Sequence, residues 1–479
     1  MPAVDIQSEN GRLPAVVWKI AAVAMLGPLL SQLDATIVNV SLSSLASELH
    51  TTLATIHWVT SGYLLALALT LPLNGWLVDR VGAKVLYLWC FSSFTLASVL
   101  CGFAWSANAL IAFRVLQGMT GGLLAPMAQM MLARAAGKQL TRVAGYASVA
   151  VVLGPIFGPV IAGAILQHAS WRWLFIVNLP VGTVAVVLAA VLLPEDRPDG
   201  PPRDLDVLGL ALLSPGLVLF LYGADHLKDR LGIRALIASL ILLVGFVRTA
   251  RRKGSGALID LTLFRRKVFP VSAMTQFFSN GILFAGQMLI PFYLVRGCGR
   301  SPSATGLMLM PLALGGACML PSLGALTSRF GLRKVSAGGA LVALLATLPF
   351  LHLAAHGFVW PVLVVMLFCR GAGLAAVGIP SMTAAYVSVE KWELATATTS
   401  LNIVQRIGGP TFTTLCAAFL AWRMKAGHSS GHLSGAFVAA FGLLCVFHAL
   451  QLLFALRLPR SVDEAAVDGL MATPEVCES

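Results

Sequence analysis

Apolar runs of about twenty residues recur along almost all of this 479-residue chain, and they constrain its fold more than any other feature. A helix needs about 20 mostly apolar residues to cross roughly 30 Å of hydrocarbon. Of the residues, 58% are hydrophobic and only 11% are charged, whereas soluble domains carry about 25% charged residues. A soluble core cannot absorb that much apolar surface. The sequence therefore predicts an all-α polytopic membrane protein.

The apolar runs predict fourteen spans, separated by short polar turns that are too short to hold a soluble domain. The first run has no small-residue cleavage site behind it, so we expect a retained span and not a signal peptide. Basic residues near span ends are retained in the cytoplasm. With the N-terminus inside, 22 of them lie on the cytoplasmic side and 8 on the other. We therefore expect both termini in the cytoplasm, with the chain in a bacterial inner membrane. The expected spans are 18–40, 56–77, 85–104, 107–132, 143–166, 173–193, 205–223, 233–250, 269–295, 304–327, 335–353, 358–386, 395–421 and 434–457.

Two charge-rich segments, 194–206 and 248–267, bracket the two middle spans and indicate a six, two, six arrangement. The halves also echo each other. LIAFRVLQGMTGGLLAP at 110–126 and MLFCRGAGLAAVGIP at 366–380 share an embedded arginine, small residues and a proline, and GWLVDRVGAK at 75–84 has a weaker counterpart in GALTSRFGLRK at 324–334. Parallel repeats of this kind build the substrate path of many transporters. The expected parts are a cytoplasmic tail (1–17), a six-helix bundle (18–193), a linker with two extra spans (194–267), a second six-helix bundle (268–457) and a cytoplasmic tail (458–479).

Only one of the 20 acidic residues, Asp34, lies well inside an expected span. An ionisable group in hydrocarbon is costly and usually functional. Thr36 and Asn39 are close enough in sequence to supply hydrogen bonds, and Arg114 on the fourth span is expected at nearly the same depth. Because burial disfavours a charged carboxylate, we expect Asp34 to bind and release protons, with Arg114 as its partner when it is ionised. The alternative is a permanently ionised pair with a purely structural role.

Three basic residues are embedded in expected spans: Arg114, Arg370 and Arg406. One acid against three bases predicts a pocket that is electropositive without ligand, which suits anionic, zwitterionic or neutral amphiphiles better than dications. In the alternative, Arg370 and Arg406 are satisfied by neighbouring carbonyl groups and contact no ligand. The candidate residues for the substrate cavity are Thr36, Asn39, Gln117, Arg370, Gln405 and Arg406.

Several function classes are disfavoured by the sequence. The formal net charge is +13, but the basic residues lie in short loops and form no continuous patch, so we expect anionic lipid and not nucleic acid as their partner. No CxxC pair or Cys/His cluster with metal spacing occurs, and we expect no metal site. HExxH and GxxxxGK[ST] motifs are also absent, and no paired acidic motif lies within a span, so we expect no enzyme.

At these residues the chain resembles the major facilitator superfamily, and in particular its fourteen-span drug:proton antiporter branch. LDATIVNVSL at 33–42 resembles the first-span motif of that branch, although Ser43 replaces the usual proline. GWLVDRVGAK resembles the gating loop, LIAFRVLQGMTGG the proton-coupling motif and GPIFGPVIAG the span-five antiporter motif, with Ala162 where glycine is common. WRWLFIVNLPVG at 171–182 is also typical. The residues that match these motifs are Asp34, Thr36, Asn39, Gly75, Asp79, Arg80, Gly82, Lys84, Arg114, Gln117, Gly118, Gly154, Pro155, Gly158, Pro159 and Gly163.

The resemblance implies the major facilitator fold, with two six-helix bundles and two extra central helices. It also implies proton-driven export of small amphipathic molecules by alternating access, with protons as the coupling ion and no other cofactor. The nearest alternative is a proton symporter or facilitator on the same fold. A membrane-embedded enzyme or sensor would need a catalytic cluster or a soluble appendage. The short loop at 424–434 offers no large docking hairpin, so a stand-alone monomer is favoured over a pump with an adaptor protein.

Overall fold

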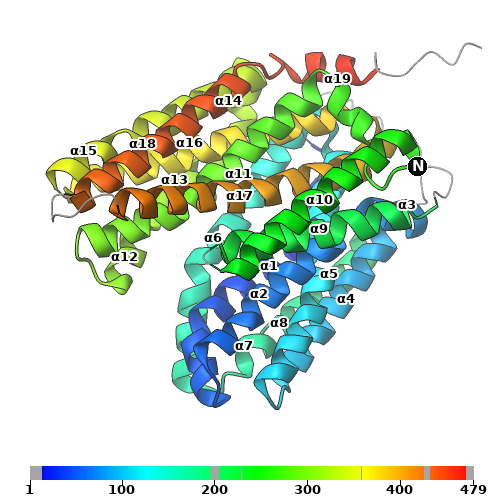
Figure 1. Cartoon of the computed structure of the whole chain (residues 1–479). Helices are drawn as coiled ribbons and strands as arrows, with labels where there is room; N and C mark the ends of the chain where they lie inside the picture. Colours follow the sequence, from blue (N-terminus) through cyan, green and yellow to red (C-terminus); the bar gives the residue numbers. More distant parts are fainter. Residues whose placement is uncertain (1–12, 196–203, 228, 358, 426–431, 471–479) are drawn as a thin grey trace, which may run out of the picture. The chain divides into compact units, whose positions relative to one another are not determined.

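The computed structural model describes residues 13–195, 204–227, 229–357, 359–425 and 432–470. Within these ranges every regular element is a helix, as the apolar runs predict (Figure 1). The chain divides into two compact units. Unit 1 comprises Met1–Tyr222, Ile233–Leu261 and Lys391–Ser400, and unit 2 comprises Gly223–Gly232, Thr262–Glu390 and Leu401–Ser479.

Within the described residues, unit 1 contains eight α-helices of the N-terminal half, and two of them begin at a polar side-chain cap. The Thr52 side chain accepts a hydrogen bond from the backbone of Thr55, and the Ser106 side chain accepts one from Ala109, which starts the second and fifth helices. The helices are α1 (Ala15–Glu48), α2 (Leu53–Thr70), α3 (Asn74–Val81), α4 (Ala83–Gly102), α5 (Ala107–Ala136), α6 (Leu140–His168), α7 (Trp173–Ile176) and α8 (Asn178–Leu192).

Small residues bring α5 close to α2. A Cβ atom at Gly118 would collide with the carbonyl oxygen of Tyr63, and one at Gly122 would collide with that of Leu67. Close backbone approach through small residues is a common way to pack helices in a membrane, where no hydrophobic effect drives them together. This helix carries Arg114, one of the candidate site residues.

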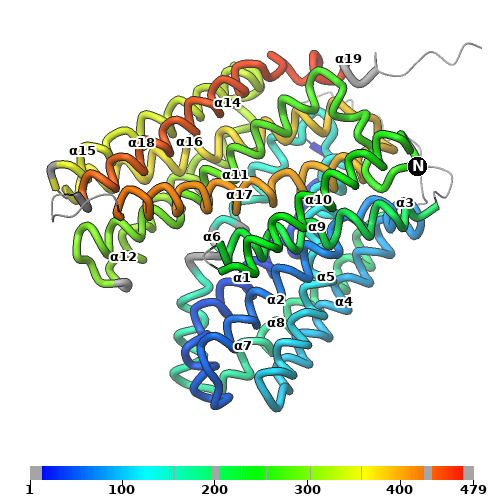
Figure 2. Tube along the Cα trace, viewed as in Figure 1, coloured from blue at the N-terminus to red at the C-terminus, as the bar shows by residue number. Residues whose placement is uncertain are grey.

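The two inserted helices, α9 (Val207–Asp225) and α10 (Arg230–Lys253), belong mostly to unit 1 and run side by side (Figures 1 and 2). The hydroxyl of Ser239 on α10 donates a hydrogen bond to the carbonyl of Gly216 on α9, at 2.7 Å. This bond satisfies a polar side chain that would otherwise be buried without a partner.

Asp206, directly before α9, connects the start of α9 to the end of α10 by hydrogen bonds. Its Oδ1 accepts hydrogen bonds from the backbone N–H of Gly209 at 2.9 Å and from Nζ of Lys253 at 2.5 Å. Its Oδ2 accepts one from the backbone N–H of Leu258 at 3.1 Å. Burial opposes ionisation of this carboxyl, but the hydrogen bond from Lys253 and the two backbone N–H groups outweigh it, so the pKa of Asp206 lies below its usual value.

Unit 2 has a core of aromatic rings. Phe412 and Phe447 stack with their ring centroids 4.4 Å apart, and Phe350 and Phe441 stack at 5.0 Å. The helices that contribute to unit 2 are α11 (Val268–Phe292), α12 (Pro302–Met308), α13 (Met310–Met319), α14 (Leu323–Thr347), α15 (Pro349–His356), α16 (Trp360–Val387), α17 (Leu394–Lys425, whose start lies in unit 1), α18 (His432–Ala455) and α19 (Val462–Leu470).

The weak repeat between 75–84 and 324–334 is present in the backbone. Gly82, between α3 and α4, has φ 83° and ψ 156°, and Gly331 inside α14 has φ 82° and ψ 165°. Each lies seven residues after the first glycine of its motif. Side chains disfavour this region of φ, so the same glycine-dependent kink occurs at the same place in both halves.

The described residues contain eleven helical stretches that are long and apolar enough to cross a membrane. Two of them, Ala107–Val149 and Ala304–Ala355, have 43 and 52 residues, more than the roughly 20 that one crossing needs. The count of fourteen spans and the cytoplasmic location of both termini stay predictions. Parts of the expected tails and of the first linker, at 1–12, 196–203 and 471–479, lie outside the described residues.

The interactions of Asp206 predict an order of stability among three variants. Asp206→Asn keeps an oxygen for Gly209 but loses the ion pair with Lys253, which is 40% exposed, so solvent screening limits the loss to about 0.5–1 kcal/mol. Asp206→Ala also loses the helix cap, which costs about 1 kcal/mol more. Asp204→Asn, at an exposed neighbouring carboxylate, should change nothing. Thermal unfolding of the purified protein in detergent measures the three differences.

The pH dependence follows from the direction of the pKa shift. A carboxyl with a lowered pKa stabilises the fold fully above its unfolded pKa, and the contribution is lost as pH falls through the folded pKa. The difference between wild type and Asp206→Asn should therefore stay constant from about pH 8 to about pH 5. A difference that disappears near neutral pH, or equal losses in the Asn and Ala variants, would contradict this account.

Candidate functional site

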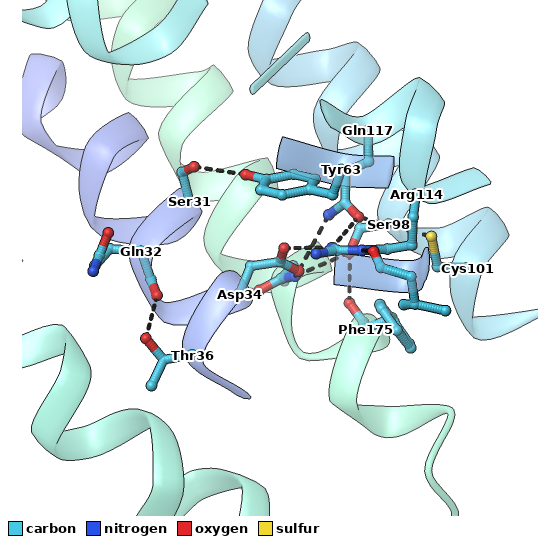
Figure 3. Close-up of polar contacts among 12 residues, drawn as sticks. Ser31, Gln32, Asp34, Thr36, Tyr63, Ser98, Cys101, Arg114, Gln117 and Phe175 are labelled. Carbon is cyan, nitrogen blue, oxygen red and sulfur yellow. Dashed lines mark hydrogen bonds and ion pairs between the residues drawn. The ribbon is translucent and has the colours of Figure 1, made fainter. Parts of the chain in front are cut away.

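Asp34 and Arg114 form an ion pair in the interior of unit 1, and both side chains are 0% exposed (Figure 3). Nη1 of Arg114, on α5, lies 2.5 Å from Oδ2 of Asp34, on α1. Asp34 and Arg114, which the sequence placed at nearly the same depth, are therefore in direct contact. Removing a charge from water costs several kcal/mol per ion, so such a pair persists only where further hydrogen bonds satisfy both partners.

Two amides complete the coordination of the carboxylate. Oδ1 of Asp34 accepts hydrogen bonds from Nδ2 of Asn178 at 2.8 Å and from Nε2 of Gln117 at 3.2 Å. Gln117 binds both partners of the ion pair, because its Oε1 also accepts a hydrogen bond from Nη1 of Arg114 at 2.7 Å. The network therefore joins α1, α5 and α8.

The rest of the Arg114 guanidinium lies against backbone and aromatic rings. Its Nε donates to the carbonyl of Val59 on α2 at 3.3 Å. Its Cζ lies 4.2 Å from the ring centroid of Tyr63 and 5.8 Å from that of Phe175, both within cation–π range. The Tyr63 hydroxyl is in turn bonded to Ser31 at 2.7 Å. Nη2 of Arg114 has no hydrogen-bond partner within the described part of the chain.

A chain of hydrogen bonds behind the carboxylate orients Asn178. Its Nδ2 also contacts Oγ of Ser98 at 3.0 Å, and that hydroxyl donates to the carbonyl of Phe175 at 3.0 Å. Asn178 was not among the site residues expected from the sequence. The available signal was an amide at the start of an apolar run, inside the 171–182 motif.

The expected hydrogen bonds from Thr36 and Asn39 to Asp34 are absent, and this expectation was wrong. The Thr36 hydroxyl donates to the carbonyl of Gln32 at 2.7 Å, on another side of α1 (Figure 3). Asn39 is exposed. The reason is helical geometry, because successive residues are rotated by about 100° around the axis. Proximity in sequence therefore placed these groups on other faces of α1. Their contact with substrate stays a prediction.

The glycines of the span-five motif let α6 approach α1. A Cβ atom at Gly158 would lie 2.7 Å from Cγ2 of Thr36, and one at Gly154 would lie 3.5 Å from Cγ of Gln32. Gly163 faces open space, with no atom within 4 Å of such a Cβ. Pro159 is exposed, whereas the side chain of Pro155 lies outside the described ones. Close contact between α1 and α6 thus depends on Gly158.

The predicted gating turn contacts the start of α17 within unit 1. Nδ2 of Asn74 donates to Oγ1 of Thr399 at 3.1 Å, and a Cβ at Gly75 would lie 3.5 Å from Cα of Thr396. The Cζ atom of Arg80 lies 5.5 Å from the ring centroid of Trp76.

A cavity of about 390 Å³ lies beside this turn. Asp79 lines it, together with Asp206 and Leu258 from the segments that flank the inserted helices. Lys84 lies in the first turn of α4. The role of this turn as a latch stays a prediction.

The cavity candidates of the C-terminal half lie in unit 2. Arg370 is 0% exposed, and its Nη2 donates to the carbonyl of Ile282 at 3.2 Å. Gln405 donates to Oε1 of Gln276 at 2.9 Å, and Arg406, which follows it on α17, is partly buried. For Arg370 the structure contains the interaction expected in the alternative interpretation, a hydrogen bond to a neighbouring carbonyl. Whether any of these side chains contacts substrate stays a prediction.

Comparisons with known proteins bear on the family and the fold of the chain. A family model described as Major Facilitator Superfamily matches residues 24–413. A multidrug resistance protein B homolog of Mycobacterium tuberculosis is 34% identical over 433 residues, which cover 88% of this chain and 80% of the relative. A putative multidrug resistance protein MdtD of Enterobacter sp. (strain 638) is 29% identical over 466 residues, covering 95% of this chain and 97% of the relative.

Two solved structures have a similar fold. The proton:xylose symporter XylE has a TM-score of 0.63 at 14% identity, covering 90% of this chain and 95% of that one. The human organic anion transporter MFSD10 (TETRAN) has a TM-score of 0.62 at 16% identity, covering 91% and 99%. At these identities the likeness shows the fold alone.

The glycines of α6 predict a difference between two otherwise identical substitutions. Gly158→Ala inserts a methyl group against Thr36 and should cost about 1–3 kcal/mol of stability, as overpacking does. Gly163→Ala meets nothing and should stay within about 1 kcal/mol of wild type. Thermal unfolding in detergent compares them, and equal stability of the two variants would show that α6 does not depend on close approach to α1.

Proposed function

Since the chain belongs to the major facilitator superfamily, we propose that it exports small amphipathic molecules, drugs among them, in exchange for protons. It is a multi-pass membrane transporter of the drug-transporting group of that family. The observation that carries the proposal of proton exchange is the fully buried pair of Asp34 and Arg114. The names of the multidrug resistance relatives support drugs as substrates.

Protonation of Asp34 changes the balance of charge in unit 1. While it is ionised, the carboxylate neutralises Arg114 and accepts bonds from Gln117 and Asn178. A proton on the carboxyl removes the negative charge and leaves the Arg114 cation without a counter-ion in a region of low dielectric. Helix packings that bring Arg114 to water or to another acceptor then gain in relative stability. Two packings with different proton affinity are what alternating access requires.

The exchange of substrate for a proton follows if substrate binds to the packing in which Asp34 is deprotonated. Proton entry then drives the chain toward the packing that releases substrate, and loss of the proton on the other side resets it. Protons are the proposed coupling ion. We further propose that the chain works as a monomer, without an adaptor protein, in a bacterial inner membrane, with both termini in the cytoplasm and its basic loops against anionic lipid.

A second part of the proposal concerns the charge of the substrate. Asp34 neutralises Arg114, whereas Arg370 and Arg406 lie on helices of unit 2, and the described parts of these helices carry no acid. A positive field favours anionic, zwitterionic and neutral amphiphiles over dications. A proton symporter or facilitator would use the same fold, and the direction of proton movement separates it from an exporter.

Asp34→Asn mimics the protonated carboxyl and should abolish coupling to protons. The amide oxygen can still accept a bond from Asn178, so we expect the variant to fold with a lower Tm. In proteoliposomes containing a pH-sensitive dye, wild type should accumulate an amphiphile against its gradient while protons move the opposite way. The variant should lose gradient-driven accumulation by more than about tenfold, yet keep exchange of labelled for unlabelled amphiphile.

A matched control is available on the same helix. Glu48→Gln removes an exposed carboxylate at the end of α1 and should transport as wild type does. Full gradient-driven accumulation by Asp34→Asn would refute proton coupling through this pair. Protons that move in the same direction as the amphiphile would establish symport instead.

Ligand charge is tested by thermal stability, because a bound ligand stabilises the folded state by mass action. Purified wild type should gain Tm with anionic, zwitterionic and neutral amphiphiles of matched hydrophobicity, and gain less with a lipophilic dication. Measurements at two pH values show whether protons compete with the ligand. A larger gain with the dication would contradict the expected electropositive cavity.

A further inference from the structure

We propose that the exposed face of the inserted helix α10 binds an anionic phospholipid, with Arg248, Arg251 and Arg252 as the site for its headgroup phosphate. All three arginines are exposed, and none of them has a hydrogen bond, ion pair or ring contact with another described residue. They are spaced by three and four residues, so their side chains leave the helix on one side. The site rests on the proposed contact of basic segments with anionic lipid and gives it a location.

The helix has two distinct faces. At about 100° per residue, its buried residues fall within one narrow arc, and its exposed apolar residues fall on the opposite side. The buried residues between 232 and 250 are Gly232, Ala235, Ser239, Phe246 and Ala250. The exposed ones are Ile233, Ile237, Leu240, Ile241, Val244 and Val247, with exposed fractions of 36–65%. The three arginines lie in the same arc, about 140° wide, as this apolar stripe and continue it to the end of α10.

The length of the stripe suits one leaflet of a bilayer. From Ile237 to Val247 it covers ten residues, or about 15 Å along the helix axis. This is half of the roughly 30 Å of hydrocarbon in a bilayer. Arg248 follows directly, at the level where the phosphate of a lipid in that leaflet lies. Arginine stems pack along apolar surface while their charged ends stay at the interface.

The chemistry of the arginines fits a phosphate group. A guanidinium is planar and presents its N–H donors in a fork that binds phosphate oxygens in pairs. No acidic residue occurs in α10, from Arg230 to Lys253, so no carboxylate on the helix competes for these donors. Basic residues next to a span attract the negative surface of an anionic leaflet, and each strengthens binding about fivefold.

The neighbouring lysine shows that these arginines are not used inside the protein. Nζ of Lys253 binds Oδ1 of Asp206 at 2.5 Å. Lys253 is two residues from Arg251, about 200° around the axis, so this carboxylate is held on the other side of α10. Basic residues near other span ends, such as Arg134 and Arg266, interact with other parts of the chain. The arginine face of α10 thus keeps its donors for a partner outside the chain.

Charge also decides between a lipid and a second copy of the chain. Arg230 and Arg234, at the start of α10, are exposed and lie in the same arc as the stripe. Two such faces, paired in either direction, would bring arginines next to arginines without an acid between them. An anionic lipid meets the same face with an opposite charge and an apolar chain.

Native mass spectrometry of the purified full chain measures the affinity of the first bound lipid without transport. Wild type should bind phosphatidylglycerol more tightly than phosphatidylcholine with the same acyl chains. Each of the three Arg→Gln substitutions should weaken binding of phosphatidylglycerol about fivefold, and the triple variant on the order of a hundredfold, which removes the preference. The triple Arg→Lys variant keeps the charges and should keep most of the affinity.

A matched control removes three exposed basic residues of unit 2, by Arg329→Gln, Arg423→Gln and Lys425→Gln, and should bind within about twofold of wild type. Thermal unfolding in detergent without lipid verifies that both triple variants are folded, because arginines near a helix C-terminus also favour the helix itself.

Three outcomes would overturn the site. They are equal losses of affinity in the two triple variants, no preference of wild type for phosphatidylglycerol, and a wild-type dimer that persists in this lipid but is lost in the α10 variant. The first outcome would assign the effect to net charge and the third would assign the face to a second copy. Asp34→Asn should bind phosphatidylglycerol as wild type does, so a failure of proton exchange and a failure of lipid binding are distinguished.

Discussion

The contact between Asp34 and Arg114 is the interaction on which the arrangement of unit 1 depends. Two opposite charges without access to water are stable only with hydrogen bonds to their remaining lone pairs and N–H groups, and here Nη2 is the one guanidinium nitrogen of Arg114 that has none among the described residues. That requirement brings an amide from α8, an amide from α5 and a carbonyl from α2 to one point. The glycines that let α5 approach α2 closely are part of the same requirement. The pair therefore specifies which helices must be neighbours, and a change in its charge acts on all of them.

Unit 2 also buries an arginine, but without a carboxylate as its partner. Arg370 occupies the place in the repeat that Arg114 occupies in unit 1, and each points toward the first helix of its half. Where α1 offers a carboxylate, α11 offers only the carbonyl of Ile282, together with the space left by Gly286. Each half thus contains a buried arginine, which is paired with a carboxylate in unit 1 and hydrogen-bonded to a carbonyl in unit 2.

Part of this arrangement could be predicted from the sequence, because the position of a residue within an apolar span gives its depth in the membrane. Counting from span ends placed Asp34 and Arg114 at nearly the same depth. The similarity of the segments 75–84 and 324–334 was also visible in the sequence, and in the structure it corresponds to equal backbone kinks at Gly82 and Gly331. Depth does not determine which face of the helix a side chain occupies. The hydrogen bond expected from Thr36 to Asp34 was therefore wrong. Asn178 was missed because an amide near a span end is common and carries no signal until the helices are packed.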